Sequence, residues 1–135
     1  MYTRIAVTID FTSMDSKTIE HAVAQGGKEA EYLLIHIVES AGALMMGSDI
    51  KDFETGSDFV NLEAYAIELR QKGYNCQLEI GYGNPKKAIP KLVNEFKSDL
   101  LVMGAHGHHG WKDFLFGATV NSVRHNVNIP VLIVR

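Results

Sequence analysis

Residues 100–107 read LLVMGAHG and join a short apolar run to a loop that contains two glycines. The run 100–103 has the length and the unbroken apolar character of a strand that is buried on both faces of a parallel sheet. Gly104 and Gly107 follow this run, and glycine allows a backbone to approach a ligand closely because it has no Cβ. This stretch therefore predicts a strand that ends in a candidate binding loop.

Other apolar runs of similar length are distributed along the chain. They lie at residues 5–9, 32–38, 76–80 and 131–134. Short apolar runs that alternate with helical patterns are typical of a parallel sheet in an α/β protein. The sequence therefore predicts an open parallel sheet of five strands, joined by right-handed crossovers and covered by helices on both faces.

The stretches between these runs carry signals of helices. Thr12-Ser13-Met14-Asp15 places hydroxyl caps before an acidic residue, and Gly26-Gly27 suits the end of the helix that follows. Asn84-Pro85 is typical of a helix start, with asparagine as the cap and proline in the first turn. The other helical faces are marked by apolar spacing at Phe59, Leu62, Ala66 and Leu69, at Ile89, Leu92, Val93 and Phe96, and at Val120, Val123 and Val127.

Two features interrupt this regular pattern. Pro90 lies within the first two turns of a predicted helix and is expected to distort it, because proline lacks the backbone N–H. Residues 41–57 are rich in glycine and in small or polar side chains. We expect them to form one long irregular surface loop with at most a helical turn.

Size and composition limit the classes of protein to which the chain can belong. Its 135 residues, 46% of them hydrophobic, suit one domain over residues 1–135. A net charge of −3 without basic runs disfavours a nucleic-acid partner. No apolar stretch approaches the roughly 20 residues that span a bilayer. The single cysteine, Cys76, is expected to be a small buried hydrophobe, and its isolation suits the reducing cytoplasm.

The predicted sheet places several chain segments at one edge. In open parallel sheets, ligands bind beyond the carboxyl ends of the strands, where the strand order reverses. Asp10 follows the first strand, Val38 and Glu39 end the second, and Met103 and Gly104 end the fourth. If the first and fourth strands are neighbours, a crevice opens between Asp10 and Gly104.

The start of the last predicted helix is a candidate anion site. Gly117, Ala118 and Thr119 open this helix. Its free N–H groups and its dipole favour a negative charge, and the threonine adds a hydroxyl donor. The chain contains neither the P-loop pattern nor the dinucleotide-binding glycine pattern, and on spacing alone a glycine-rich connection between strand and helix explains these residues as well as a phosphate site does.

The glycines together with other segments resemble a known family. Gly104-x2-Gly107-x9-Gly117 is similar to the glycine motif of the ATP-binding universal stress proteins. The resemblance extends over the whole chain and includes the strand that ends in Asp10, the strand end Ile35-His36-Ile37, Gly83-Asn84-Pro85, the stretch 100–107, and the closing Ile129-Pro130-Val131-Leu132-Ile133-Val134.

The resemblance implies a fold, a ligand and a set of contacts. The fold is the adenine nucleotide α-hydrolase-like sheet in the order 3-2-1-4-5, in a homodimer, and the ligand is ATP or AMP, with Mg or Mn riding on the phosphates. The residues that match the family's nucleotide-binding positions are Ile9, Asp10 and Ile37 for the adenosine part, Met103, Gly104, His106 and Gly107 for the ribose and first phosphates, and Gly117, Ala118 and Thr119 for the outer phosphates. Residues 131–134 form an apolar strand that we expect at the sheet edge, and pairing with the same strand of a second chain would cover it.

One position departs from the family pattern and leaves a second function open. The family has serine or threonine directly after the third glycine, where this chain has Ala118. The first hypothesis is a regulatory module that responds to ATP or AMP in a stress or metabolic response. The alternatives are a dimeric adaptor or stress protein that does not bind nucleotide, and a cytosolic regulatory domain of a larger membrane protein.

Catalytic and metal sites are less well supported by the residues. Asp10 has no evident partner for acid–base chemistry, no Ser/His/Asp set has a recognisable context, and weak nucleotide hydrolysis is the most that we expect. The histidines His106, His108, His109 and His125 lack the spacing and the additional ligands of a dedicated metal site. We assign no catalytic residue and no metal ligand.

Overall fold

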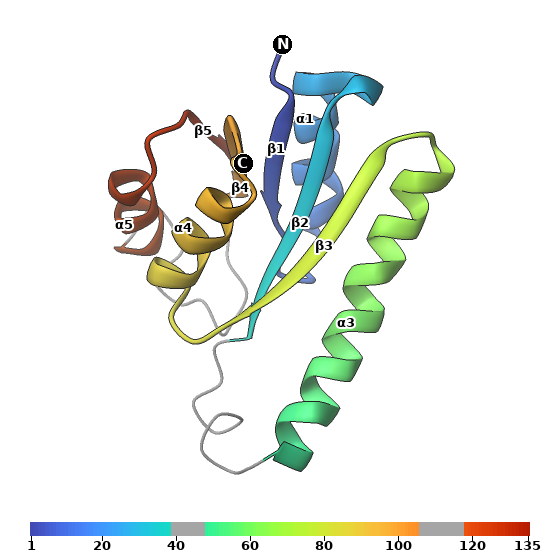
Figure 1. Cartoon of the computed structure of the whole chain (residues 1–135), viewed down its shortest axis with the longest axis vertical. Coiled ribbons are helices and arrows are strands. Elements are labelled where there is room, and N and C mark those ends of the chain that lie inside the picture. The colour runs from blue at the N-terminus through green and yellow to red at the C-terminus, as the bar shows by residue number, and fades with distance from the viewer. Residues whose placement is uncertain (39–47, 106–117) are drawn as a thin grey trace.

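A five-stranded sheet with helices on both faces forms the protein in the computed structural model, which describes residues 1–38, 48–105 and 118–135 (Figure 1). The elements in chain order are β1 (Arg4–Thr8), α1 (Met14–Gly26), a 3-10 helix (Gly27–Glu29), β2 (Glu31–Val38), α3 (Ser48–Gln71), β3 (Asn75–Tyr82), α4 (Pro85–Glu95), β4 (Leu100–Gly104), α5 (Ala118–Asn126) and β5 (Val131–Val134). No helix within these described ranges is long and apolar enough to cross a membrane.

The strand order is β3-β2-β1-β4-β5, and every pairing is parallel, which confirms the predicted topology. The chain moves outward from β1 through β2 to β3 and then returns to the other side of β1 as β4. The strand order therefore reverses between β1 and β4, where Ile5 lies opposite Leu100 and Val7 opposite Val102.

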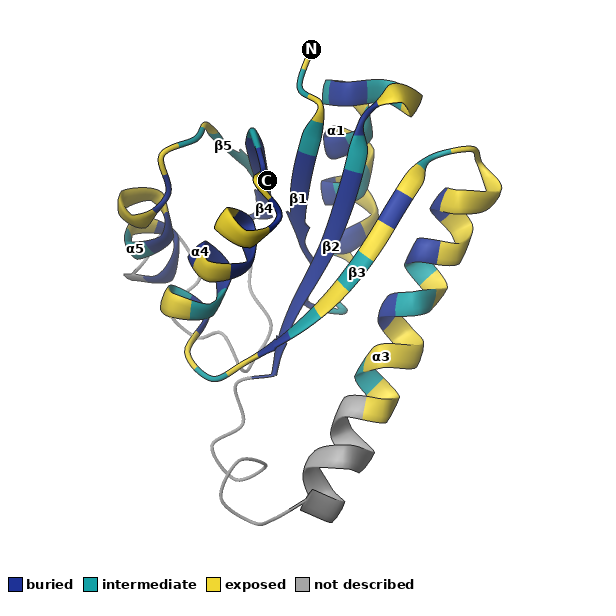
Figure 2. Ribbon diagram, viewed as in Figure 1, coloured by how far each residue is buried: buried dark blue, intermediate teal, exposed yellow. Residues whose placement is uncertain are grey.

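The central strands are mostly apolar because both faces of the sheet are covered. In Figure 2 most residues of β1 and β2 are coloured as buried, whereas in β3 at the edge exposed residues alternate with buried or intermediate ones. One core cluster joins the sheet to α1 and α3, through residues such as Val7, Ala22 and Leu62. The other joins the opposite face to α4 and α5, through residues such as Ile35 and Ile89.

Helix α4 begins as the sequence predicts. The Asn84 side chain caps it, because Oδ1 accepts a hydrogen bond from the amide of Lys86 at 3.0 Å, and Pro85 occupies the first helical position. Pro90 lies inside the helix and is buried, yet α4 continues to Glu95. The expected distortion therefore does not end the helix.

Helix α3 corrects one expectation. Residues 41–57 were expected to be irregular, but α3 begins at Ser48 and runs through Gly56 to Gln71. Polar residues and a single glycine lower helix stability only modestly, and Leu62 and Ala66 anchor the later turns against the sheet. The periodic apolar signal begins only where the helix contacts the core, which is why the sequence pattern placed its start too late.

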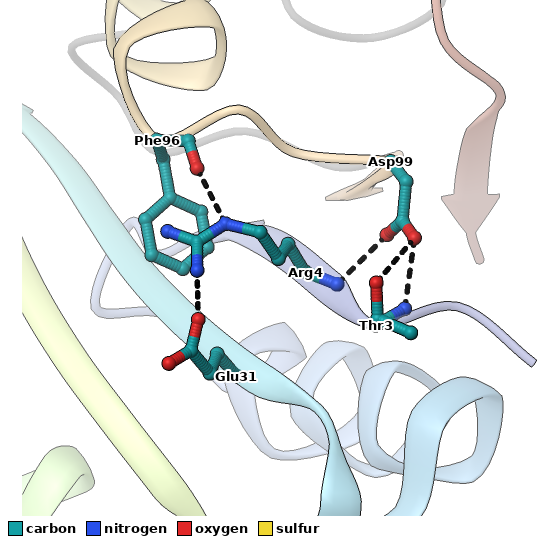
Figure 3. A network of polar contacts seen from close by, with 5 residues as sticks. All are labelled: Thr3, Arg4, Glu31, Phe96 and Asp99. Carbon is teal, nitrogen blue, oxygen red and sulfur yellow. Dashed lines mark hydrogen bonds and ion pairs between the residues drawn. The ribbon is translucent and has the colours of Figure 1, made fainter.

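A polar network fixes the amino end of β1 (Figure 3). The Asp99 carboxylate accepts hydrogen bonds from the Thr3 amide at 2.8 Å, the Thr3 hydroxyl at 3.0 Å and the Arg4 amide at 2.9 Å. The Arg4 guanidinium lies 4.1 Å from the centre of the Phe96 ring and pairs with Glu31. Burial alone would raise the pKa of Asp99, but the hydrogen bonds from Thr3 and Arg4 outweigh it and hold this pKa below its ordinary value. The network joins β1 to β2 and to the turn before β4.

Candidate functional site

The carboxyl ends of β1 and β4 lie side by side at the point where the strand order reverses. Backbone hydrogen bonds continue the neighbouring pairings past the ends of these two strands, because the Ile9 amide donates to the Ile35 carbonyl of β2 and the Ala105 amide donates to the Val134 carbonyl of β5, each at 2.7 Å. Asp10 begins the connection after β1 at this reversal point, which is where open parallel sheets bind ligands and where the sequence predicts the crevice.

A tight turn holds Asp10 in place. Its Oδ1 accepts hydrogen bonds from the Thr12 amide at 3.1 Å and the Thr12 hydroxyl at 2.6 Å. Phe11 between them has a φ of 62°, a left-handed conformation that a phenylalanine rarely adopts. Asp10 is 7% exposed, so a carboxylate at the end of the central strand is mostly withdrawn from water.

Asp15, in the first turn of α1, is the second carboxyl group of this turn. Its Oδ1 accepts a hydrogen bond from the Asp10 amide at 3.1 Å, and its Oδ2 is buried without a hydrogen-bond partner among the described residues. Burial raises the pKa of Asp15 to about 7, and the negative charge of Asp10 adds to this rise, whereas the Asp10 amide and Tyr65 act in the opposite direction.

Aromatic side chains surround the turn on the side of α3. The Phe11 ring has its centre 4.3 Å from that of His36 and 6.5 Å from that of Tyr65, to which it is stacked. His36 connects three elements, because Nδ1 lies 2.7 Å from the Ile9 carbonyl oxygen after β1 and Nε2 lies 3.5 Å from Oδ2 of Asp58 on α3. The turn after β1 is therefore held from β2 and from α3.

Apart from Gly104, the other predicted nucleotide residues divide into three groups. Ile9, Ile37 and Met103 lie at the carboxyl ends of their strands with buried side chains, Ile9 in the α1–α3 core and the other two in the α4–α5 core. Ala118 and Thr119 begin α5, and Thr119 is buried. His106, Gly107 and Gly117 lie outside the described residues.

Gly104 has a packing role that the sequence did not indicate. A Cβ on this residue would lie 3.2 Å from the hydroxyl oxygen of Thr18 and 3.8 Å from Cβ of Met14. Both of these residues belong to α1, which contacts β4. Because Gly104 has no side chain, α1 can pack closely against β4. This packing explains the glycine without a ligand.

Sequence reasoning missed Asp15 and Tyr65 as neighbours of the site. An acidic residue in the first turn of a helix is a common stabilising feature, so it gave no sign that Asp15 would be buried beside Asp10. The available signal was the spacing of two aspartates across a predicted strand–turn–helix junction. Among the described residues, no group of three or more histidine, cysteine or acidic side chains could hold a metal ion.

A family model and curated relatives place the chain in the same family. The model of the universal stress protein family matches residues 1–135. Universal stress protein MJ0577 of Methanocaldococcus jannaschii is 24% identical over 155 residues, with 100% of this chain and 96% of the relative covered.

Solved structures share the fold. The structure of MJ0577 matches with a TM-score of 0.82 at 25% identity, over 99% of this chain and 96% of that one. A universal stress protein in complex with cAMP matches with a TM-score of 0.66 at 18% identity, over 99% and 97% of the two chains. One from Archaeoglobus fulgidus in complex with dAMP matches with a TM-score of 0.68 at 16% identity, over 99% and 98%.

Proposed function

The chain belongs to the universal stress protein family, and from this premise we propose that it is a regulatory module that binds ATP or AMP in the crevice between Asp10 and the start of α5. The observation that carries the proposal is the position of Asp10, a buried carboxylate after β1 at the reversal of strand order. The two relatives in complex with cAMP and dAMP support an adenine nucleotide as the ligand.

The chemistry of the crevice suits the two ends of a nucleotide. A carboxylate such as Asp10 accepts hydrogen bonds from ribose hydroxyls or from the adenine amino group. The first turn of α5, with Ala118 and Thr119, offers backbone N–H groups and a positive dipole end to phosphates. The adenosine would lie near Ile9 and Ile37, and the ribose and first phosphates near Met103 and the segment 104–107. Mg or Mn would be bound to the phosphates.

Calorimetric titration with ATP, ADP and AMP tests this proposal. We expect Gly117→Val to abolish binding, because a branched side chain would occupy the phosphate position. Asp10→Ala should weaken binding about tenfold, which corresponds to about 1.4 kcal/mol for a lost hydrogen bond to a charged group. Glu20→Gln, an exposed change on α1, is the control and should bind as the unaltered protein does. Absence of binding of all three nucleotides at millimolar concentration would contradict the proposal.

Ala118 favours a second candidate, a dimeric adaptor or stress protein that acts through partners without nucleotide. The family's serine or threonine at this position would add a hydroxyl donor for phosphate, and alanine cannot supply it. Ala118→Ser should leave binding unchanged or strengthen it. If neither the unaltered chain nor this variant binds, the adaptor function replaces the nucleotide function. A cytosolic regulatory domain of a larger membrane protein remains the other alternative, and the lone buried Cys76 is in keeping with the cytoplasm.

We further propose a homodimer through β5. This strand is at the sheet edge, and Val131, Leu132 and Ile133 are only partly buried. Antiparallel pairing with β5 of a second chain around a two-fold axis would cover these side chains and the open backbone groups.

A further inference from the structure

Asp10 and Asp15 form a buried pair of carboxyl groups at the proposed nucleotide site. They are 7% and 2% exposed, and the Asp10 amide holds Oδ1 of Asp15 at 3.1 Å. Both hydrogen bonds from Thr12 end on Asp10, so they stabilise a negative charge there. Oδ2 of Asp15 has no donor within the described parts of the chain. Of the two groups, Asp15 is therefore the one less able to remain ionised.

The groups that act most on Asp15 are two acidic neighbours. They are Asp10 after β1 and Tyr65 on α3, and Glu68 on α3 adds a negative charge that acts on Tyr65. β4, which α1 also contacts, has no titratable residue. His36 of β2 lies beyond the Phe11 ring and contacts Asp58. Two like charges in this position would repel at short range, and a shared proton removes that repulsion.

We propose that Asp15 is a positioning residue of the nucleotide site. When nucleotide binds, the protonated Asp15 donates a hydrogen bond to Asp10, and binding therefore becomes weaker as the pH rises. This inference rests on the proposed function. In the protonated state the Asp15 O–H donates a hydrogen bond to the Asp10 carboxylate, which keeps its charge and its remaining acceptor capacity for the adenosine. In the ionised state the two carboxylates repel, and the additional negative charge opposes an anionic ligand.

Two opposing effects decide where Asp15 loses its proton. The start of α1 favours a negative charge in its first turn. Burial acts against it and is the larger effect, and the pKa of Asp15 is about 7. A nucleotide seated over the turn would exclude more water and favour the protonated form further. By linkage, binding should therefore take up a proton in this pH range.

The test measures affinity for adenosine and for AMP between about pH 6 and about pH 8.5. Adenosine is the decisive probe because it carries no phosphate that titrates in this range. For the unaltered protein we expect roughly tenfold weaker adenosine binding at the upper end of the range. Asp15→Asn, which mimics the protonated carboxyl, should bind with nearly constant affinity. Glu20→Gln on the same helix should retain the pH dependence of the unaltered protein.

The outcomes separate this inference from the proposed function. Binding with parallel pH profiles in the unaltered protein and in Asp15→Asn would overturn the inference and leave the nucleotide function intact. Absence of adenosine and AMP binding at every pH in both proteins would overturn both. If Asp15→Asn does not fold, carbon NMR of the aspartate carboxyl groups in the unaltered protein decides. One carboxyl should titrate near pH 7 and shift upward with adenosine, and titration of every aspartate below about pH 5, or no upward shift with adenosine, would contradict the inference.

Discussion

The main-chain amide of Asp10 donates a hydrogen bond to Oδ1 of Asp15 across 3.1 Å, which folds the start of α1 back onto the end of β1. This bond is possible because Phe11, between the strand and the helix, adopts a left-handed φ of 62°. The same turn brings two carboxyl groups together, and one oxygen of the Asp15 carboxyl, Oδ2, is buried without a hydrogen-bond partner among the described residues. The stability of the protein should therefore depend on the protonation of Asp15 even in the absence of ligand.

Asp15→Asn should stabilise the protein above neutral pH. The pKa of Asp15 is raised in the folded state from 3.8 to about 7, so its contribution to stability is complete below pH 3.8 and is lost as the pH rises to about 7. The variant should lack this loss and exceed the unaltered protein by on the order of 2 kcal/mol at alkaline pH, with little difference in acid. Urea unfolding across this pH range measures it, and Glu20→Gln is the control. A variant that is less stable at every pH would contradict the expectation.

Asp99→Asn should destabilise the protein by about 1 to 2 kcal/mol at neutral pH, because an amide nitrogen would replace one of the oxygens that accept from Thr3 and Arg4. The pKa of Asp99 is lowered in the folded protein, so its stabilising effect is present above pH 3.8 and disappears as the pH falls through the folded-state value. The stability curves of the two proteins should converge in acid. Glu95→Gln, at an exposed position of α4, should show neither effect.

Gly104→Ala should cost about 1 kcal/mol of stability, because its Cβ would lie 3.2 Å from the hydroxyl oxygen of Thr18. Removal of that oxygen by Thr18→Ala should relieve the contact, so the double variant should be more stable than the sum of the single changes predicts. Gly56→Ala on α3 is the control, since nothing lies within 4 Å of its added Cβ. Additive effects in thermal unfolding would argue against the packing role of Gly104.

Ile133→Pro should convert the proposed dimer to a monomer. Leu101 donates to the Pro130 carbonyl and Ala105 to the Val134 carbonyl, so in a parallel pair the amides of Val131 and Ile133 point away from β4. Proline removes an outward N–H without breaking the pairing to β4, and prolines are tolerated on sheet edges. Light scattering at tens of micromolar measures the mass, with Ile133→Val as the control that keeps the N–H. A proline variant that remains dimeric would exclude this strand as the interface.

The fold was largely predictable because its signals are local and repeated. Apolar runs such as 32–38 and 100–103 mark strands buried on both faces, and Asn84-Pro85 marks the start of α4. The start of α3 was missed because residues 48–57 contain only two large apolar residues, Ile50 and Phe53, which are too few to mark a periodic helical face. The strand order came from the family resemblance, and the structure confirms it.

The candidate site was predictable in its location and less so in its composition. Asp10 could be chosen as a candidate because it follows a strand, and parallel sheets bind ligands beyond the carboxyl ends of their strands. The burial of Asp15 could not be predicted, because it depends on the Phe11 turn and on Tyr65 from a distant helix. A glycine such as Gly104 is ambiguous in sequence, since the space of a missing side chain is filled either by a ligand or by a helix.

The hydrogen bonds from Thr3 to Asp99 join residues that are 96 positions apart. They lie beside the β1–β4 pairing, which among the described residues is the only strand pairing between the first three strands and the last two. Closure of so long a loop is entropically costly before its contacts form. We therefore expect β1, β2 and β3 to assemble early and the β4–β5 unit to dock late. The proposed ligand crevice lies along the same seam, so we expect it to form only at the last stage of folding, and a bound nucleotide would slow unfolding more than it accelerates folding.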